Sequence, residues 1–360
     1  MAQRGVNAPV HPVMEEIVVA PLDDAAAWDA FVAGHVEATP FHSRAWCEAI
    51  TKATGHRCHV LAARDAAGAI VGLLPLHHIR SPLFGQALVA SGFAVDGGLL
   101  ADSDAAATAL ADAAAALAAS LSVPSVELRG GALPDGEGWR RDEGVYAGFA
   151  RDLAADDQAE LLAVPRKQRA EVRKALESDL TVTTGSDAAE RRDHYHIYAT
   201  SVRNLGTPVF PKALFDAVLD AFGNDADILT VREGGRPVAS VLSLYWRGTV
   251  MPYWGGGTAD ARRVRANERM YFALMLHARA KGCTRFDFGR SKLGTGPFAY
   301  KKNWGFEPRP LVYARWLAPG ETPRDTNPTS AKYRLQVDLW KKLPLWAANR
   351  IGPLIARGLG

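Results

Sequence analysis

The chain has 360 residues, of which 48% are hydrophobic and 22% are charged. A chain of this length is too long for one ordinary hydrophobic core, so two domains are predicted. The hydrophobic content gives each of them enough apolar surface to bury in a core of its own. The charges nearly cancel at a net +3, which excludes a histone-like nucleic-acid binder and a disordered acidic chain, so any electrostatic partner must be met by a local basic patch.

Cysteine usage and apolar runs bear on the cellular compartment. The three cysteines, Cys47, Cys58 and Cys283, form no Cys-x-x-Cys pair and leave one thiol over under any pairing, which favours a reducing compartment over a disulfide framework. The N-terminal stretch has no apolar run long enough for a signal peptide, and no run of about 18 uncharged apolar residues occurs. The sequence therefore predicts a soluble cytoplasmic protein.

Two similar segments organise the chain into halves. Val60–His78 aligns without gaps on Ile228–Trp246, and each is predicted to form a β-hairpin, with an apolar strand, a small-residue turn and a second apolar strand. A helix over about 103–120 and then a short strand follow the first hairpin, and a helix from about 267 and then a short strand follow the second. The repeated order predicts duplication, with two unrelated α/β halves as the alternative.

The expected fold class is mixed α/β, with two mixed, largely antiparallel sheets flanked by helices. We expect a first domain over 1–152, a second over 153–318, and a basic, proline-containing amphipathic tail over 319–360. A long basic helix over about 156–180 is predicted to begin the second domain and to join the halves. Its cationic side chains include Arg166, Lys167 and Arg173.

Several familiar motifs are absent or incomplete. The GTGPFA segment contains Pro297 and lacks the strand–turn–helix surroundings of a dinucleotide site, and no Walker A sequence occurs. The GRSKLG segment has one residue too many for a nucleophile elbow at Ser291. The histidines and cysteines between 42 and 59 match no zinc spacing, because Cys58 and His59 point to opposite faces of a strand. Neither a metal site nor a resident cofactor is predicted.

Two loops of the second half concentrate residues suited to binding. In SVRNLGTPVFP a helix is predicted to end near Asn204–Gly206, because glycine permits the left-handed closure, and two prolines then make the loop rigid. In MPYWGGG, Gly255–Gly257 permit the close approach of a ligand or another backbone, or else form a simple turn before the next helix. Thr258 or Asn267 is expected to cap that helix.

These stretches resemble the Fem family of non-ribosomal peptidyltransferases, which are two fused acetyltransferase-like (GNAT) domains that use aminoacyl-tRNA in place of acetyl-CoA. The similarity is carried by VPRKQRAEVRKAL, SVRNLGTPVFP, YWGGG, FDFGRSKLGTGPFAYKKNWGFEP and WKKLPLWAANRIGP, and is strongest with the FemAB-related branch associated with PEP-CTERM/exosortase gene clusters. It covers about 21–360, specifically in the second half and loosely in the first. The acetyl-CoA loop of simple GNAT enzymes, Q/R-x-x-G-x-G/A, is missing, although RSKLGTG from Arg290 comes within one residue of it.

The resemblance implies roles for individual residues. In Fem enzymes a Phe-Lys pair before a glycine-containing turn meets the CCA end of tRNA, and Tyr300-Lys301 matches that pair. Lys301 would stabilise the oxyanion and the leaving alkoxide of ester aminolysis, an effect of ~3–4 kcal/mol, and Tyr300 would stack on the terminal adenine. The alternative for Lys301 is a solvated lysine on a strand edge. Asp287 is the candidate base, since burial raises a carboxyl pKa, with an ion pair to Arg285 or Arg290 as the alternative.

The resemblance also implies a binding surface. The candidate substrate contacts are Arg203, Asn204, Tyr253, Gly255, Gly256, Arg290, Lys292, Tyr300 and Lys302. Arg203 and Tyr253 are expected to position the acceptor. Lys292, Lys302 and the predicted basic helix are expected to track tRNA phosphates.

The expected function is transfer of an aminoacyl group from aminoacyl-tRNA to an amine-bearing envelope precursor or amino sugar, linked to exopolysaccharide or cell-envelope biosynthesis. One alternative is acyl transfer from acyl-CoA or an acyl carrier protein to an amino sugar, which needs a pantetheine channel between splayed strands. Another is a non-catalytic scaffold for glycosyltransferases. The tail from 333 to 360 either packs back on the protein or lies in a membrane surface, which would make the protein peripheral at the inner membrane.

Overall fold

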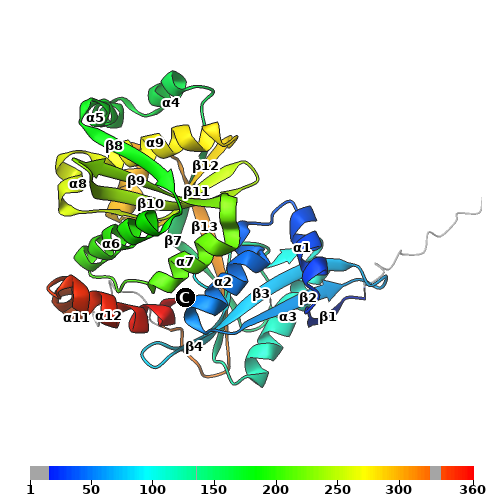
Figure 1. Cartoon of the computed structure of the whole chain (residues 1–360). Helices are drawn as coiled ribbons and strands as arrows, with labels where there is room; N and C mark the ends of the chain where they lie inside the picture. The colour runs from blue at the N-terminus through cyan, green and yellow to red at the C-terminus, as the bar shows by residue number, and fades with distance from the viewer. Residues whose placement is uncertain (1–15, 135, 325–333) are drawn as a thin grey trace, which may run out of the picture.

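The computed structural model of the chain describes residues 16–134, 136–324 and 334–360. Figure 1 shows the first half, in blue and cyan, beside the second half, in green and yellow. Most of the N-terminal stretch that bears on a signal peptide and residues 325–333 of the expected tail lie outside the described residues.

One mixed sheet runs through both halves, so the two expected sheets are joined edge to edge. Its strand order is β1-β2-β3-β4-β6-β13-β7-β12-β11-β10-β9-β8, and β5 pairs with β3. The strands are β1 (Val18–Pro21), β2 (Cys58–Arg64), β3 (Ile70–Ser81), β4 (Gly85–Ala90), β5 (Leu100–Ala101), β6 (Ser125–Arg129), β7 (Trp139–Asp152), β8 (Leu180–Gly185), β9 (Ala226–Glu233), β10 (Arg236–Trp246), β11 (Thr249–Gly257), β12 (Arg285–Lys292) and β13 (Pro308–Leu317).

Both predicted hairpins are present. β2 and β3 pair antiparallel in the first half, and β9 and β10 pair antiparallel in the second. In each half the following strand is connected through a helix to a strand that pairs with it in parallel, β4 with β6 and β11 with β12. The duplicated order of elements therefore corresponds to a repeated arrangement in space.

The last strands of the two halves are exchanged. β7, from the first half of the chain, pairs antiparallel with β12 of the second half. β13, from the second half, pairs antiparallel with β6 of the first. β7 and β13 also pair with each other at the middle of the sheet. Main-chain hydrogen bonds therefore tie the halves together, and each exchanged strand lies beside the parallel pair of the other half.

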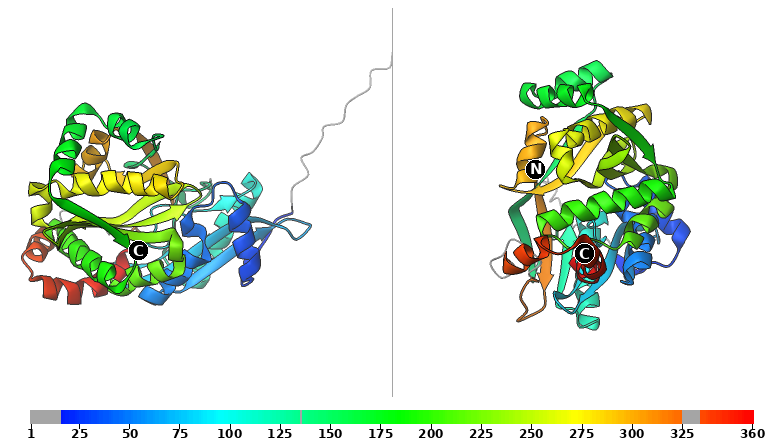
Figure 2. Two further views of the ribbon diagram at one scale, coloured as in Figure 1. Left: turned by 45° about the horizontal axis from the view of Figure 1, so that its top comes forward. Right: turned by 60° about the vertical axis from the view of Figure 1, so that its left-hand side comes forward.

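Helices cover both faces of the sheet, as Figure 2 shows from two sides. They are α1 (Ala25–Gly34), η1 (Pro40–His42), α2 (Arg44–Thr54), α3 (Asp104–Ser120), α4 (Asp157–Ala163), α5 (Arg166–Glu177), α6 (Ala188–Leu205), α7 (Lys212–Phe222), η2 (Gly223–Asp225), α8 (Ala259–Arg263), α9 (Ala266–Ala280), α10 (Gly296–Asn303), α11 (Arg334–Lys341), α12 (Leu345–Ala356) and η4 (Arg357–Leu359).

Three apolar cores hold these layers together. Leu110 of α3 belongs to a core built mainly from the first half and completed by Ala314 of β13. Met275 of α9 belongs to a core built mainly from the second half and completed by Phe149 of β7. The third core spans both halves, because α2 packs against α7, and it contains Trp46 and Phe215. Burial of apolar surface stabilises a fold by about 25 cal/mol per Å². This shared core is therefore a second link between the halves, besides the exchanged strands.

Local sequence sets several helix boundaries. The Asp187 side chain accepts hydrogen bonds from the amides of Ala189 and Glu190 at the start of α6, and Gly206 ends that helix with φ 83°. The predicted end of this helix is confirmed. The prediction of one long basic helix before it is wrong, because Pro165 forces the preceding residue into extended backbone and separates α4 from α5.

The tail folds back onto the protein. Arg203 of α6 donates hydrogen bonds to the carbonyl oxygens of Lys341 and Leu343, and a ring nitrogen of His56 lies 2.7 Å from the carbonyl oxygen of Arg357. The end of the chain lies beside α2 and β4 in Figure 1. Of the two expectations for the tail, packing on the protein is therefore observed. Within the described ranges, the structure contains no helix that is long and apolar enough to cross a membrane.

Candidate functional site

A cavity lies where the parallel strands β11 and β12 separate. The two strands pair only at Thr249–Arg285 and Val250–Phe286, and β12 then pairs with β7 alone while β11 stays with β10. A cavity of about 640 Å³ lies between the separated ends, with α6, α8, α9 and α10 around it. Splayed strands are the feature that the acyl-CoA alternative requires.

The Gly255–Gly257 run is the end of β11, so the alternative of a simple turn is wrong. A Cβ atom on Gly256 would lie 2.5 Å from the Cβ atom of Ser201 on α6, and one on Gly257 would lie 2.8 Å from the Cβ atom of Ala261 on α8. Glycine is required here because two helices pack directly on the strand backbone. This close packing forms one wall of the cavity.

Lys301 lies on the opposite wall, in the last turn of α10. Its Nζ atom donates hydrogen bonds to the carbonyl oxygens of Gly289, at 3.1 Å, and Arg290, at 2.9 Å. The ammonium also lies 5.5 Å and 5.4 Å from the ring centres of Phe149 and Phe288. Burial lowers the pKa of Lys301 to about 8. This side chain is fixed and partly desolvated, unlike a solvated lysine on a strand edge.

Asp287 lies behind this wall, on β12, and does not line the cavity. Its Oδ1 atom accepts a hydrogen bond of 2.8 Å from the amide of Gly289, one of the two residues whose carbonyls hold Lys301. Burial raises the pKa of Asp287, and the Gly289 amide and the Lys301 ammonium oppose that change. The Asp287 carboxyl group therefore interacts electrostatically with the Lys301 ammonium.

The two arginines considered as ion-pair partners of Asp287 have other contacts. Arg285 forms an ion pair of 2.9 Å with Asp152 at the end of β7. Arg290 donates a hydrogen bond of 2.8 Å to the hydroxyl of Tyr313 on β13, and its guanidinium lies 4.6 Å from the centre of an aromatic ring of β7. Arg290 thus contributes to the junction of the exchanged strands and lies outside the cavity lining.

An unpartnered hydroxyl and an uncapped helix end border the cavity. Thr258 precedes α8 without making a side-chain cap, and its buried Oγ1 atom has no hydrogen-bond partner among the described residues. α9 begins after Arg265, which is left-handed with φ 57° and makes no side-chain cap, while Asn267 lies inside the helix. Neither expected cap forms. Arg262 and Asn267 line the cavity here, where free amides and the helix dipole favour an anion.

The cavity brings together some of the predicted contact residues. Those on its walls are Asn204, Gly256, Tyr300 and Lys301. Arg203 instead points to the tail. The hydroxyl of Tyr253 donates a hydrogen bond of 2.8 Å to the carbonyl oxygen of Phe93, and its ring packs edge-on against Trp46. Tyr253 therefore belongs to the core that spans the halves.

Three further candidates also lie outside the cavity lining. Lys292 ends β12, and Lys302 is exposed on α10 directly after Lys301. A Cβ atom on Gly255 would lie 3.1 Å from the Val241 side chain, so this glycine faces the neighbouring strand β10. In the chain, Lys302 stands next to Lys301 and Gly255 stands next to Gly256, and both of these neighbours line the cavity.

The basic helix α5 begins beside the turn that follows α10. Gly305 in that turn has φ 84°, and a Cβ atom on it would lie 3.0 Å from the Cδ atom of Pro165, which immediately precedes α5. The exposed cations of α5 include Arg166, Lys167 and Arg173. Two basic segments that are far apart in the sequence are therefore neighbours at this end of the protein.

Sequence reasoning missed several residues of the site. Ser201 and Tyr271 line the cavity from helices, and no local pattern indicates which helix face meets it. Arg262 stands in a run of arginines before a helix, which was an available signal for an anion site. Asp96 of the first half lies within electrostatic range of Asp287, and burial raises its pKa to about 6. The proximity of Asp96 and Asp287 depends on how the two halves pack, so no pattern in the sequence predicts it.

Residues 163–302 match the family described as "Acetyltransferase (GNAT) domain". This segment contains β11, β12 as far as Lys292, and α10 as far as Lys302, and so includes the cavity and Lys301. The match and the arrangement of strands and helices agree in giving the second half a GNAT-like fold. No curated protein sequence is significantly similar to the chain.

Solved structures with the same fold extend over both halves. The crystal structure of FemX has a TM-score of 0.64 at 17% identity, covering 84% of this chain and 97% of that chain. L-PGS from Bacillus licheniformis has a TM-score of 0.53 at 13% identity, covering 89% and 98%. A tandem GNAT protein from the clavulanic acid biosynthesis pathway has a TM-score of 0.53 at 15% identity, covering 85% and 100%. Similarity at these identities establishes a tandem GNAT fold.

Proposed function

We propose that this protein transfers an aminoacyl or acyl group to an amine in the β11–β12 cavity, with Lys301 at the reaction centre. The observation that carries the proposal is a partly desolvated ammonium, with its pKa lowered to about 8 by burial, held by two carbonyl oxygens on the wall of a cavity of about 640 Å³. The GNAT-domain match over 163–302 supports acyl transfer as the reaction class.

The chemistry explains why a fixed ammonium is useful. The acceptor nitrogen attacks the carbonyl carbon of the donor, a C–N bond forms, and the carbonyl oxygen becomes an oxyanion. The C–O bond of an ester donor then breaks, and the proton lost from the nitrogen balances the charge of the leaving oxygen. Lys301 can stabilise both negative charges without moving, and removal of one such donor typically costs about 3–4 kcal/mol. Asp287 would act on Lys301 by favouring its charged form.

We infer that the donor is aminoacyl-tRNA. Tyr300 lies on the cavity wall beside Lys301 and offers a ring on which a terminal base can stack. The exposed cations of α5 begin next to the turn after α10, where a polynucleotide leading away from the cavity would meet them. The acceptor that we propose is an amine-bearing envelope precursor or amino sugar, and the exosortase-associated setting follows from the sequence resemblance alone.

A second donor class has its own supporting observation. The uncapped start of α9, Arg262 and the unpartnered Oγ1 atom of Thr258 together suit a diphosphate, which every CoA thioester carries. In that case the separated strands would hold the pantetheine arm, and a thiolate would leave in place of an alkoxide. Arg262 then discriminates the two donors, because it lies on α8, shortly before the start of α9, while Lys301 lies on α10.

The test is binding of alanyl-tRNA and seryl-tRNA analogues with amide-linked amino acids, at two salt concentrations. Wild type is compared with Lys301→Ala and Arg262→Ala, and acetyl-CoA and a long-chain acyl-CoA are the competitors. Salt-sensitive binding that Lys301→Ala weakens and that CoA thioesters leave unchanged supports aminoacyl-tRNA. Thermal stabilisation by a CoA thioester that Arg262→Ala abolishes supports the acyl-CoA donor. Binding of neither donor overturns the enzymatic proposal in favour of a scaffold.

A further inference from the structure

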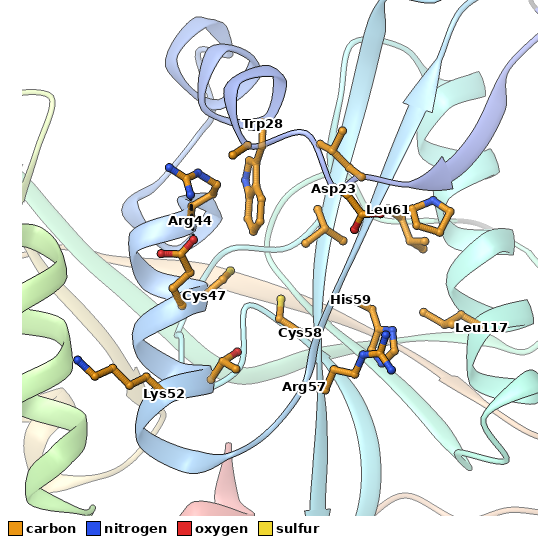
Figure 3. Close-up of a pocket in the computed structure, with 16 residues that line it drawn as sticks. Asp23, Trp28, Arg44, Cys47, Lys52, Arg57, Cys58, His59, Leu61 and Leu117 are labelled. Carbon is orange, nitrogen blue, oxygen red and sulfur yellow. Dashed lines mark hydrogen bonds and ion pairs between the residues drawn. The ribbon is translucent and has the colours of Figure 1, made fainter.

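A second group of reactive side chains lies in the first half, between α2 and the strands β2 and β3. Cys47 on α2, Cys58 on β2 and His77 on β3 bring one ligand atom each to within 4.8 Å of one another. Cys58 and His77 are directly opposite in the antiparallel pair, so their side chains share a face of the sheet. Figure 3 shows the sulfur atoms of Cys47 and Cys58 pointing toward each other.

The group borders a cavity of about 620 Å³ that is separate from the one at Lys301. Both cysteines line this cavity, and Cys58 is half-buried whereas Cys47 is only 1% exposed. Cys58 is therefore the more exposed of the two residues. The other charged or titratable side chains around this cavity are Asp23, Arg44, Glu48, Lys52, Arg57 and His59.

The hydrogen bonds of His77 argue against a metal centre. The amide of Gly92 donates a hydrogen bond of 3.0 Å to Nδ1, so that nitrogen carries no proton. The proton of the ring is then on Nε2, which lies 3.3 Å from the carbonyl oxygen of Cys47. A metal-bound histidine uses one nitrogen as a ligand and donates from the other. Here one nitrogen is occupied as an acceptor and the other is a donor near the two sulfur atoms.

The surroundings make the two thiols unequal. The Cys47 thiol, the Cys58–His77 contact and the amide of Leu76 lower the pKa of Cys58 to about 5, with the hydrogen bond from Cys47 as the largest cause, against the effect of burial. Burial raises the pKa of Cys47. The directions of these two shifts make Cys58 the more acidic thiol of the pair and leave the proton on Cys47.

We propose that Cys58 is an oxidant-sensitive nucleophile for small hydroperoxides and that Cys47 is its resolving partner. The Cys58 sulfur attacks the hydroxyl oxygen of the peroxide, the O–O bond breaks, and the second oxygen takes a proton from solvent and leaves as water or an alcohol. This step oxidises the thiolate to a sulfenic acid. Cys47 then attacks that sulfur, hydroxide leaves and takes the Cys47 proton as water, and a disulfide between Cys47 and Cys58 forms.

The first test follows alkylation of each cysteine in the reduced full chain by peptide mass spectrometry between pH 6.5 and 8.5. We expect the rate at Cys58 to change less than about twofold, because the thiolate is fully formed across this range. Alkylation of an ordinary thiol with a pKa near 8.5 is about 50-fold slower at pH 6.5 than at pH 8.5. Cys283 is the internal control, because it is buried, outside this cavity, and burial raises its pKa. Equal pH profiles at Cys58 and Cys283 would overturn the proposal.

The second test adds equimolar hydrogen peroxide or cumene hydroperoxide at pH 7 and maps the products. Wild type is expected to yield the disulfide between Cys47 and Cys58, and Cys47→Ser is expected to stop at a Cys58 sulfenic acid that dimedone traps. Cys283→Ser should behave as wild type. Oxidation spread equally over all three cysteines contradicts the proposal, as does one equivalent of tightly bound zinc that blocks alkylation of Cys58. Because the pH profile uses wild type, poor folding of Cys47→Ser leaves the first test decisive.

Discussion

The Nζ atom of Lys301 lies 2.9 Å from the carbonyl oxygen of Arg290, where β12 bulges against the exchanged strand β7. The bulge turns two successive carbonyl groups toward α10, and Phe149 of β7 lies beneath the ammonium. A strand from the first half of the chain thus helps to hold the proposed reaction centre of the second half. The exchange of strands therefore bears on the proposed reaction centre as well as on stability.

Replacement of Lys301 tests its proposed role most directly. We expect Lys301→Ala to lower kcat by about 10²–10³-fold, because a fixed donor to the oxyanion and the leaving group is lost. The melting temperature should change little, since removal of the side chain also removes the cost of burying its ammonium group. Single-turnover kinetics with an activated ester donor measure the effect, and Lys212→Ala on α7 is the matched control. A wild-type kcat in Lys301→Ala would contradict the role.

The pH dependence of kcat should carry an alkaline limb near pH 8. Burial lowers the pKa of Lys301 to about 8, so the charged form that stabilises the oxyanion is present below that pH and is lost above it. The Asp287 charge raises the pKa of Lys301. Asp287→Asn should therefore move the alkaline limb to lower pH, whereas loss of a general base would remove the acidic limb. Full pH profiles of both proteins separate these roles.

Acid stability should depend on His194. This side chain is completely buried, and burial lowers its pKa to about 3, against 6.5 for the ordinary group. A lowered histidine pKa contributes stability that is present above pH 6.5 and is lost as the pH falls below it, by up to about 1.4 kcal/mol per pH unit. His194→Asn should reduce the acid slope of the free energy of unfolding between pH 6.5 and 4.5 in urea titrations. The exposed His196→Asn is the control and should keep the wild-type slope.

The cations of α5 should contribute to tRNA affinity through charge alone. We expect replacement of Arg166, Lys167 and Arg173 by alanine to weaken binding of the aminoacyl-tRNA analogue. The plot of log K against log salt should flatten by about 0.7–0.9 for each phosphate that the variant no longer neutralises. Arg236→Ala, an exposed cation in the β9–β10 hairpin, is the control. An unchanged salt slope in the triple variant would show that tRNA does not pass along α5.

The outer face of α12 exposes large apolar side chains. Trp346 is 73% exposed and Leu354 is 66% exposed on α12, while the inner face of the helix packs on the protein. We expect the protein to cosediment with anionic phospholipid vesicles, and Trp346→Ser combined with Leu354→Ser to reduce the bound fraction severalfold. Val36→Ser, which removes an exposed apolar side chain of the first half, should have no effect. Equal binding by the double variant and wild type would contradict the prediction.

Much of the local structure follows from sequence patterns. The two hairpins and the helices after them follow from alternating and helical periodicity, and the end of α6 at Gly206 follows from the need for a left-handed residue. Pro165 is itself a sequence signal for the break between α4 and α5. The helical spacing of the apolar residues around it nevertheless led to the prediction of one continuous helix. Lys301 was identified by resemblance, and its pKa and hydrogen-bond partners follow only from the bulge in β12.

By itself, the sequence determined the elements, their repetition and the chemistry available in each segment, because periodicity, turn residues and caps act between near neighbours in the chain. Only the tertiary structure decided the exchange of β7 and β13, the cavity between β11 and β12, and the meeting of Cys58 with His77. These features depend on main-chain pairing between distant strands, and backbone hydrogen bonds are almost the same for every residue type. Which strands pair is therefore decided by how all the apolar faces are buried together.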